Sequence, residues 1–285
     1  MLWFILSLSC AFITTFLDVW TKKVSEKLSP FKIAQGKIFI SAILIFIYFI
    51  IFKKDFIDLR NVLLISLIVP LEILSLILYI KAISFWKLSL TIPLLSITPL
   101  PLFLFSKLFL KDKISSGGVI GVLLIVFGSY ILNISQYKEG ILAPFIALFK
   151  EKGSRLMLIV ALIFSFDSAI GKKCIEISSV NAFIFNYFVL MFFGFFIFSI
   201  FKKEFFSKKD LKNLIPLGFF TFLLSIFQFT AYSLAPVVYV ISLKRLSILF
   251  SVLSGKLFFK EKKILEKLLG TFTMVLGSII LGLFS

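Results

Sequence analysis

The sequence predicts an all-α polytopic membrane protein with ten transmembrane helices in two inverted five-helix repeats. Hydrophobic residues make up 60% of the chain and the mean hydropathy is +1.11, whereas soluble domains are about 45–50% apolar. A soluble fold would leave much of this excess in large exposed apolar patches. Two further observations, a series of long apolar segments and an internal repeat, complete the prediction.

The apolar segments are long enough to cross a bilayer, which takes about 20 residues of helix. Short charged connections separate them, and together they fill most of the chain, so no extramembrane domain is expected. The ten predicted spans are 2–20, 31–52, 61–80, 87–110, 116–134, 156–172, 182–201, 213–234, 236–259 and 266–284.

The longest connection, 135–155, divides the chain into two halves. It contains an apolar run at 141–149 that is too short to span the membrane and is flanked by lysines. We interpret this connection as an interfacial linker. The predicted organisation is a first repeat at 1–134, the linker, and a second repeat at 156–285.

An internal repeat relates the two halves, because 82–132 aligns with 231–281 without a gap at an offset of 149. The opening helices also match, with Thr21-Lys22-Lys23 aligned to Gly171-Lys172-Lys173 at an offset of 150. Each half contains an odd number of spans, so the two halves must have opposite orientations in the membrane. Matched pairs in the first block include Ala82/Ala231, Ser84/Ser233, Lys107/Lys256, Asp112/Glu261, Gly121/Gly270 and Gly128/Gly277.

The repeated block resembles the EamA domain of the drug/metabolite transporter superfamily. The resemblance rests on the turns Lys111-Asp112-Lys113 and Lys260-Glu261-Lys262, each followed by a helix with two glycines seven residues apart. Asp112 departs from the family, which usually has Glu there. The resemblance implies ten helices, a central cavity lined mainly by helices 1, 3, 4, 6, 8 and 9, and transport of small metabolites.

The motif residues have structural interpretations. We expect Asp112 and Glu261 at equivalent membrane-edge positions, each near the start of the last helix of its repeat, where a carboxylate is favoured by the helix dipole. Gly121, Gly128, Gly270 and Gly277 are interpreted as close-packing sites between helices.

Composition argues against other classes of protein. The chain has no His, and its two cysteines, Cys10 and Cys174, have no metal-ligand spacing. No phosphate-binding Gly-x4-Gly-Lys motif occurs. The net charge of +17 comes mostly from basic residues at helix ends, where anionic lipid rather than nucleic acid is the natural partner. We expect no cofactor, no metal and no enzymatic activity.

Lys244 and Arg245, the cationic pair, lie near the middle of the predicted span 236–259. A charge at that depth costs at least about 2.5–3.5 kcal/mol. A stripe of serines, including Ser247 and Ser251, shares the helix face of Lys244. The pair is a candidate anion-binding site, or alternatively part of a structural ion pair. Adjacent helical residues diverge by about 100°, so one of the two should point partly elsewhere.

Three acidic residues lie within predicted spans. Glu72 is either the ion partner of the cationic pair or a proton-coupling carboxylate. Asp18 faces the cavity or forms an ordinary helix-end pair with Lys22. Asp167 has no basic residue one turn ahead of it, so a cavity-facing role is open.

Three polar residues complete the candidate binding set. Tyr79 and Gln228 are repeat mates at an offset of 149, and Tyr239 lies near the start of its span. Each could donate a hydrogen bond to substrate, or the tyrosines could be interfacial anchors.

We therefore expect a secondary transporter that moves a small anionic or zwitterionic metabolite by alternating access across a bacterial inner membrane. Its partners are the small-molecule substrate and membrane lipids, with no nucleic acid, and a homodimer is left open. The alternative is an intramembrane enzyme of lipid or isoprenoid metabolism, which would need a clustered acid–base or metal set.

Two indications of orientation oppose each other. The resemblance implies that both termini are cytoplasmic. More Lys and Arg flank the helix ends on the other side, and the positive-inside rule places those residues in the cytoplasm.

Overall fold

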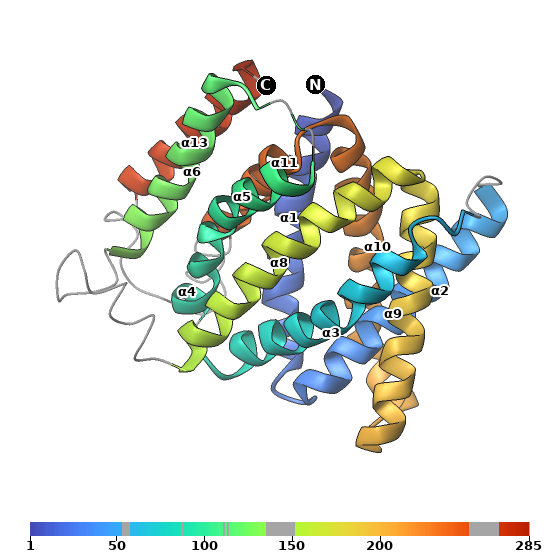
Figure 1. Cartoon of the computed structure of the whole chain (residues 1–285). Coiled ribbons are helices and arrows are strands. Elements are labelled where there is room, and N and C mark those ends of the chain that lie inside the picture. The colour runs from blue at the N-terminus through green and yellow to red at the C-terminus, as the bar shows by residue number, and fades with distance from the viewer. Residues whose placement is uncertain are drawn as a thin grey trace.

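The computed structural model describes residues 1–52, 58–86, 88–110, 112, 114–134, 152–250 and 268–284. Helices and the short connections between them make up this part of the chain. Figure 1 shows the helices packed into one bundle, with both termini at the same end. The elements are α1 (Leu2–Val24), α2 (Pro30–Phe52), α3 (Val62–Phe85), α4 (Leu88–Thr91), η1 (Ile92–Ile97), α5 (Pro99–Phe109), α6 (Ser116–Ile134), α8 (Lys152–Ile177), α9 (Val180–Lys202), η2 (Lys208–Asp210), α10 (Leu211–Leu234), α11 (Val237–Lys244) and α13 (Leu268–Phe284).

Among these residues, six helical stretches are long and apolar enough to cross a membrane: α1, α2, α3, α8, α9 and η2 with α10. Shorter apolar helices lie at Leu94–Phe109, Ser116–Ile131 and Phe272–Leu281. The all-α membrane class is thus confirmed. Ten continuous spanning helices are not found, because the predicted spans 87–110 and 236–259 are both interrupted.

Prolines explain the interruption of the first of these spans. A short α4 gives way to the 3-10 segment η1, and α5 begins only at Pro99. Proline has no amide hydrogen and its ring clashes with the preceding turn, so the start of a helix is its favoured position. Pro93 lies at the start of η1 and Pro99 at the start of α5, in keeping with this preference.

The second interruption occurs at the cationic pair. α11 ends at Lys244, and a turn at Arg245 and Leu246 precedes a further helical stretch at 247–250. The turn is tightened by bonds to the third residue back, such as Leu246 N–H to Leu243 O at 2.9 Å. Residues 251–267, which contain the rest of the predicted span, lie outside the described part.

The repeat is visible in the helix boundaries. α2 and α9 begin and end at an offset of 150, and α3 and α10 begin and end at an offset of 149. The two interruptions also correspond, because Arg245 is the repeat mate of Ser96 in η1. Paired interruptions at matching positions are typical of transporters whose binding site lies between the repeats.

Two repeat-related lysines, Lys22 and Lys172, each bind the C-terminal end of the third helix of their own repeat. Lys22 Nζ lies 2.9 Å from the carbonyls of Ile83, Ser84 and Trp86 at the end of α3. Its mate Lys172 donates to the carbonyls of Tyr232 and Ala235 at the end of α10, the latter at 3.2 Å. In each case the ammonium satisfies the unpaired carbonyls of a helix C-terminus.

A second matched pair of hydrogen bonds crosses between the repeats. Thr15 on α1 donates to the carbonyl of Ser247 at 3.2 Å, just after the interruption that follows α11. Ser165 on α8 donates to the carbonyl of Thr98 at 2.9 Å, between η1 and α5. Each interrupted segment is therefore held by the first helix of the other half.

The last helices of the two halves, α6 and α13, lie side by side (Figure 1). A Cβ added at Gly121 would lie 2.9 Å from the carbonyl oxygen of Gly277, and one at Gly128 would lie 2.7 Å from that of Gly270. The four motif glycines thus occur where the two backbones touch, and no larger residue fits there without a shift.

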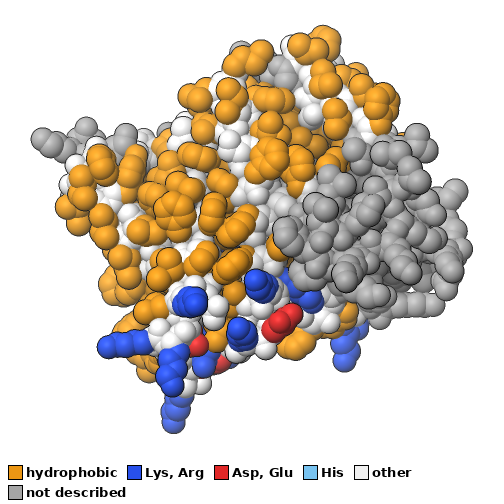
Figure 2. Space-filling model, turned by 180° about the vertical axis from the view of Figure 1, so that it is seen from behind, with side chains coloured by type: hydrophobic (Ala, Val, Ile, Leu, Met, Phe, Trp, Pro, Cys, Tyr) orange, Lys and Arg blue, Asp and Glu red, His pale blue; other side chains and the backbone are white. Residues whose placement is uncertain are grey.

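The outer surface has the polarity of a membrane protein. Large apolar side chains such as Leu63, Phe127 and Phe201 are exposed. Figure 2 shows hydrophobic side chains over most of the visible face, with Lys and Arg gathered along one edge. An apolar surface of this extent requires lipid around it.

Candidate functional site

A cavity of about 160 Å³ lies between the two halves and is lined by α1, α2, α3, η1, α8, α9, α10, α11 and Arg245. It is smaller than the roughly 300–1,000 Å³ of sites for drug-sized ligands, so it fits a small solute. Its charged lining residues are Asp18, Lys37, Glu72, Asp167, Lys244 and Arg245. Every candidate binding residue except Tyr239 is part of this lining.

Most lining positions occur as repeat-related pairs. This arrangement places the cavity where the two halves meet. The pairs are Thr14/Phe164, Leu17/Asp167, Asp18/Ser168, Lys37/Tyr187 and Ile38/Phe188 at an offset of 150, and Glu72/Thr221, Leu76/Ser225, Tyr79/Gln228 and Leu95/Lys244 at an offset of 149.

The cationic pair is held by neutral partners. Arg245 is 4% exposed and donates to Thr98 Oγ1 at 3.0 Å, while its Nε is buried without a partner. Lys244 Nζ lies 2.6 Å from Gln228 Oε1. Neither forms an ion pair with an acid among the described residues, so the structural ion-pair alternative is not what is observed.

Both members of the cationic pair line the cavity, contrary to the expected divergence. Arg245 is the C-cap of α11, and both side chains are long enough to reach the same cavity from different directions.

Glu72 does not pair with either cation among the described residues, so the ion-pair alternative is not observed there. Its Oε1 accepts a hydrogen bond of 3.0 Å from the Tyr187 hydroxyl. The Asp167 carboxyl lies beside it within hydrogen-bonding reach. α8 extends from Lys152 to Ile177, which places Asp167 in the interior of the helix.

Asp18 also faces the cavity, and its expected helix-end pair with Lys22 does not form. The Tyr79 hydroxyl donates to Asp18 Oδ1, and Asp18 Oδ2 is buried without a partner. Lys22 is instead turned to the carbonyls at the end of α3. Those carbonyls are nearby only in the folded bundle, which sequence spacing does not show.

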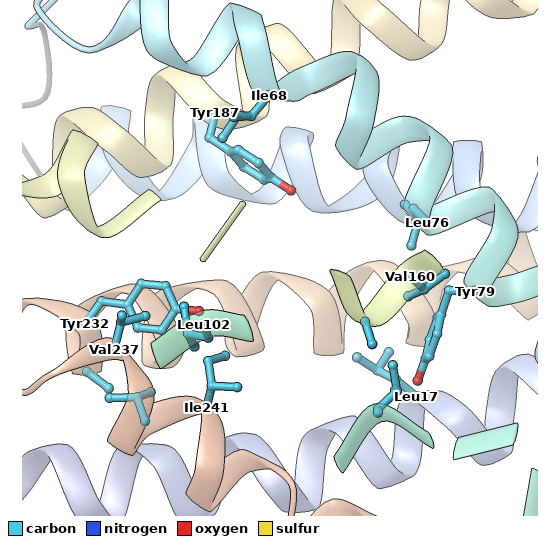
Figure 3. Packing of buried hydrophobic residues seen from close by; sticks show 14 of the residues in the cluster. Leu17, Ile68, Leu76, Tyr79, Leu102, Val160, Tyr187, Tyr232, Val237 and Ile241 are labelled. Carbon is cyan, nitrogen blue, oxygen red and sulfur yellow. The ribbon is translucent and has the colours of Figure 1, made fainter. Parts of the chain in front are cut away.

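Sequence reasoning missed Lys37, Tyr187 and Tyr232. Lys37 on α2 lines the cavity, and its charge acts on Asp18 and Glu72. The signal was present, because Lys37 lies within the apolar span 31–52. Figure 3 shows Tyr79, Tyr187 and Tyr232 within the buried hydrophobic cluster, contributed by α3, α9 and α10; nothing in the sequence distinguishes the last two from packing residues.

Tyr239 lies elsewhere. It is buried, and its hydroxyl accepts the Ser115 N–H at 2.9 Å. The same hydroxyl lies against Gly118 near the start of α6. Tyr239 therefore fixes the connection before α6 and does not face the cavity.

Asp112 occupies a structural position, but at a different helix from the one expected. Its Oδ1 lies 3.9 Å from Lys172 Nζ, and its Oδ2 lies 3.3 Å from the Val237 N–H at the start of α11. The carboxylate thus interacts with the N-terminus of α11 rather than that of α6. Glu261 lies outside the described residues.

No cluster of three or more potential metal ligands occurs in the described ranges. The lining offers three basic side chains, which are Lys37 and the cationic pair, together with three acidic side chains, tyrosines and an amide. Such a set can bind and orient a small charged solute.

Comparison with known proteins agrees with this arrangement. A solved structure titled "Crystal structure of protein" is similar to this chain with a TM-score of 0.73 and 12% identity, covering 98% of this chain and 96% of that one. At that identity the likeness shows the fold alone. No curated protein matches. The model of the EamA-like transporter family matches residues 1–134 and 151–283. Both halves are covered, and the chain belongs to the EamA-like transporter family.

Proposed function

We propose that this protein is a secondary transporter that binds a small anionic or zwitterionic metabolite in the central cavity and moves it by alternating access. Family membership makes the chain an integral membrane transporter of the drug/metabolite type and gives no support to the intramembrane enzyme alternative. The substrate class and the mechanism are inferred from the cavity.

The observation that carries the proposal is the cationic pair without an acidic partner among the described residues. Arg245 keeps a buried N–H unpaired, and Lys244 is bound only to an amide oxygen. A buried charge is stable only with water, a counter-charge or a ligand. A carboxylate or phosphate of the substrate would supply that counter-charge, and the Arg245 guanidinium suits it geometrically.

Alternating access is supported by the position of the cavity. It lies where the repeats meet, beside the two interrupted segments, and each segment is held by a helix of the other half. Rocking of one half against the other would open such a cavity to each side in turn. The membrane we infer is a bacterial inner membrane, whose anionic lipids suit the basic edge of the molecule.

The test is counterflow in proteoliposomes with a panel of labelled solutes: inorganic phosphate, mono- and dicarboxylates, sugar phosphates and amino acids. Arg245→Ala should weaken binding of the transported solute about 10- to 100-fold, because a hydrogen bond to a charged group contributes about 1.5–3 kcal/mol. The matched control is Lys212→Ala, which removes an exposed lysine outside the cavity.

Folding is checked by size exclusion and tryptophan fluorescence of each variant. Normal counterflow by a folded variant that carries both Lys244→Ala and Arg245→Ala would refute the binding role. Absence of counterflow for every class of solute in the panel would refute the function.

A further inference from the structure

Glu72 and Asp167 form a second cluster in the cavity that anion binding does not use. They come from α3 and α8, which pack along each other. Both oxygens of Asp167 are buried, and no N–H or hydroxyl of the described residues donates to either. The group within hydrogen-bonding reach is the Glu72 carboxyl. Two ionised carboxylates are both acceptors, so a bond between them requires a proton on one of them.

The lysine whose charge reaches Glu72 is shared with a third acid. Glu72 accepts from Tyr187, and Lys37 is the lysine whose charge reaches it. Lys37 also acts on Asp18, so it is shared. The described ion pairs join other residues. The other titratable and charged groups facing the cavity are Asp18, Lys37, Tyr79, Tyr187, Tyr232, Lys244 and Arg245.

We propose that Glu72 and Asp167 together hold one exchangeable proton, and that its binding and release couple transport to the proton gradient. This inference rests on the proposed function. On release, the shared proton passes to water in the open cavity and leaves two carboxylates; on binding, one carboxylate becomes a carboxylic acid again. No other bond changes.

The charge of the cavity determines the direction of coupling. With the pair protonated, the cationic pair attracts an anion; with the pair ionised, the added negative charge opposes it. Substrate binding and proton binding therefore favour each other, and this coupling is reciprocal. An anion and a proton should move together, in the same direction.

A substrate-free test measures the proton directly. Infrared spectra of the purified protein at neutral pH should show the carbonyl stretch of a protonated carboxyl group. The band should weaken in Glu72→Gln and in Asp167→Asn, because either change leaves a single acid hydrogen-bonded to an amide. Glu176→Gln is the matched control, since Glu176 also lies on α8 but pairs with Lys173 at the surface. A band that neither variant alters would overturn the proposal.

The transport test uses the panel compound that shows counterflow. With the membrane potential clamped at zero, a pH difference of one unit should raise accumulation of that compound up to about tenfold for one proton. Glu72→Gln and Asp167→Asn, which mimic the protonated acid, should lose this response in whatever counterflow each variant shows. Glu176→Gln should keep the response.

The two proposals fail differently. If the wild type shows counterflow but no response to the pH difference, or if both variants respond fully, proton coupling is refuted and the transporter stands. If the wild type shows no counterflow with the panel, the proposed function fails. A pH dye entrapped in the vesicles gives an independent measurement of proton movement. A solute gradient should change the internal pH with the wild type and with Glu176→Gln, but not with Glu72→Gln or Asp167→Asn.

Discussion

Lysines within the apolar helices of this bundle have two separate roles that their sequence context does not distinguish. Lys22 and Lys172 bind the free carbonyls of helix ends, so their charge stabilises the scaffold. Lys244 lines the cavity with one amide partner, and its charge is available to a ligand. The difference lies in the number and kind of acceptors within reach, which is a property of the folded bundle.

Lys172→Met should destabilise the protein by about 3–5 kcal/mol, because it leaves the carboxylate of Asp112 without its cationic partner in a buried site. Lys22→Met, with carbonyls as its acceptors, should have a smaller effect of about 1–3 kcal/mol. Lys173→Met breaks only a half-exposed pair and should change stability by about 1 kcal/mol or less. Unfolding in detergent measures all three, and equal stabilities would contradict the assignment.

At the scale of residues, a charge within an apolar span correctly predicted residues that line the cavity. Glu72, Asp167 and the cationic pair were singled out on that basis, and all line the cavity. The same signal marks Lys37, a charge within the predicted apolar span 31–52. Partners were not predictable, because the Tyr187–Glu72 and Tyr79–Asp18 contacts join residues far apart in the chain.

The elements repeat more faithfully than the cavity they enclose. The boundaries of α2 and α9, those of α3 and α10, both capping lysines and the hydroxyl bonds to the interrupted segments match between halves. The side chains at repeat-related positions of the cavity differ in chemistry. The repeat mate of Glu72 is Thr221, and that of Lys37 is Tyr187. Matched positions therefore build the scaffold, and unmatched positions give the cavity its charge. Hydropathy predicted where the spans lie but not the interruptions, which depend on prolines and on contacts with the other half.

Because α6 and α13 approach closely at their glycines, we expect larger residues at these positions to lower the stability of the protein. Gly128→Ala should destabilise the protein by about 1–3 kcal/mol, because the added Cβ would lie 2.7 Å from the backbone oxygen of Gly270. Gly171→Ala in α8 is the control, since its Cβ would meet a movable Phe183 ring at 3.3 Å, and its effect should stay below about 1 kcal/mol. Thermal unfolding of the two variants compares them, and equal midpoints would refute the packing role.

The whole molecule is an apolar body with a basic edge. That edge lies at the end of the bundle opposite the termini (Figures 1 and 2). Composition alone predicted the membrane class, because apolar surface on this scale cannot be covered by a soluble fold. Orientation was not predictable, because family resemblance and the distribution of basic residues point in opposite directions.

Labelling with a membrane-impermeant maleimide tests this architecture. The native cysteines, Cys10 and Cys174, are buried and would be replaced by alanine. Leu2→Cys and Phe284→Cys, both at exposed positions near the termini, should then be labelled from one side of the membrane. Lys208→Cys, in the exposed connection between α9 and α10, should be labelled from the other.

The expected result follows from the crossings. Ten crossings, as the repeat predicts, would return the chain to its starting side whether or not two of the segments are interrupted, so both termini should share a side. Labelling of Leu2→Cys and Phe284→Cys from opposite sides would require an odd number of crossings and would refute the two-times-five organisation. Labelling of Lys208→Cys from outside intact cells would place the termini in the cytoplasm, as the family resemblance implies. Protection of that site in intact cells, with labelling only after lysis, would show that the basic edge sets the orientation.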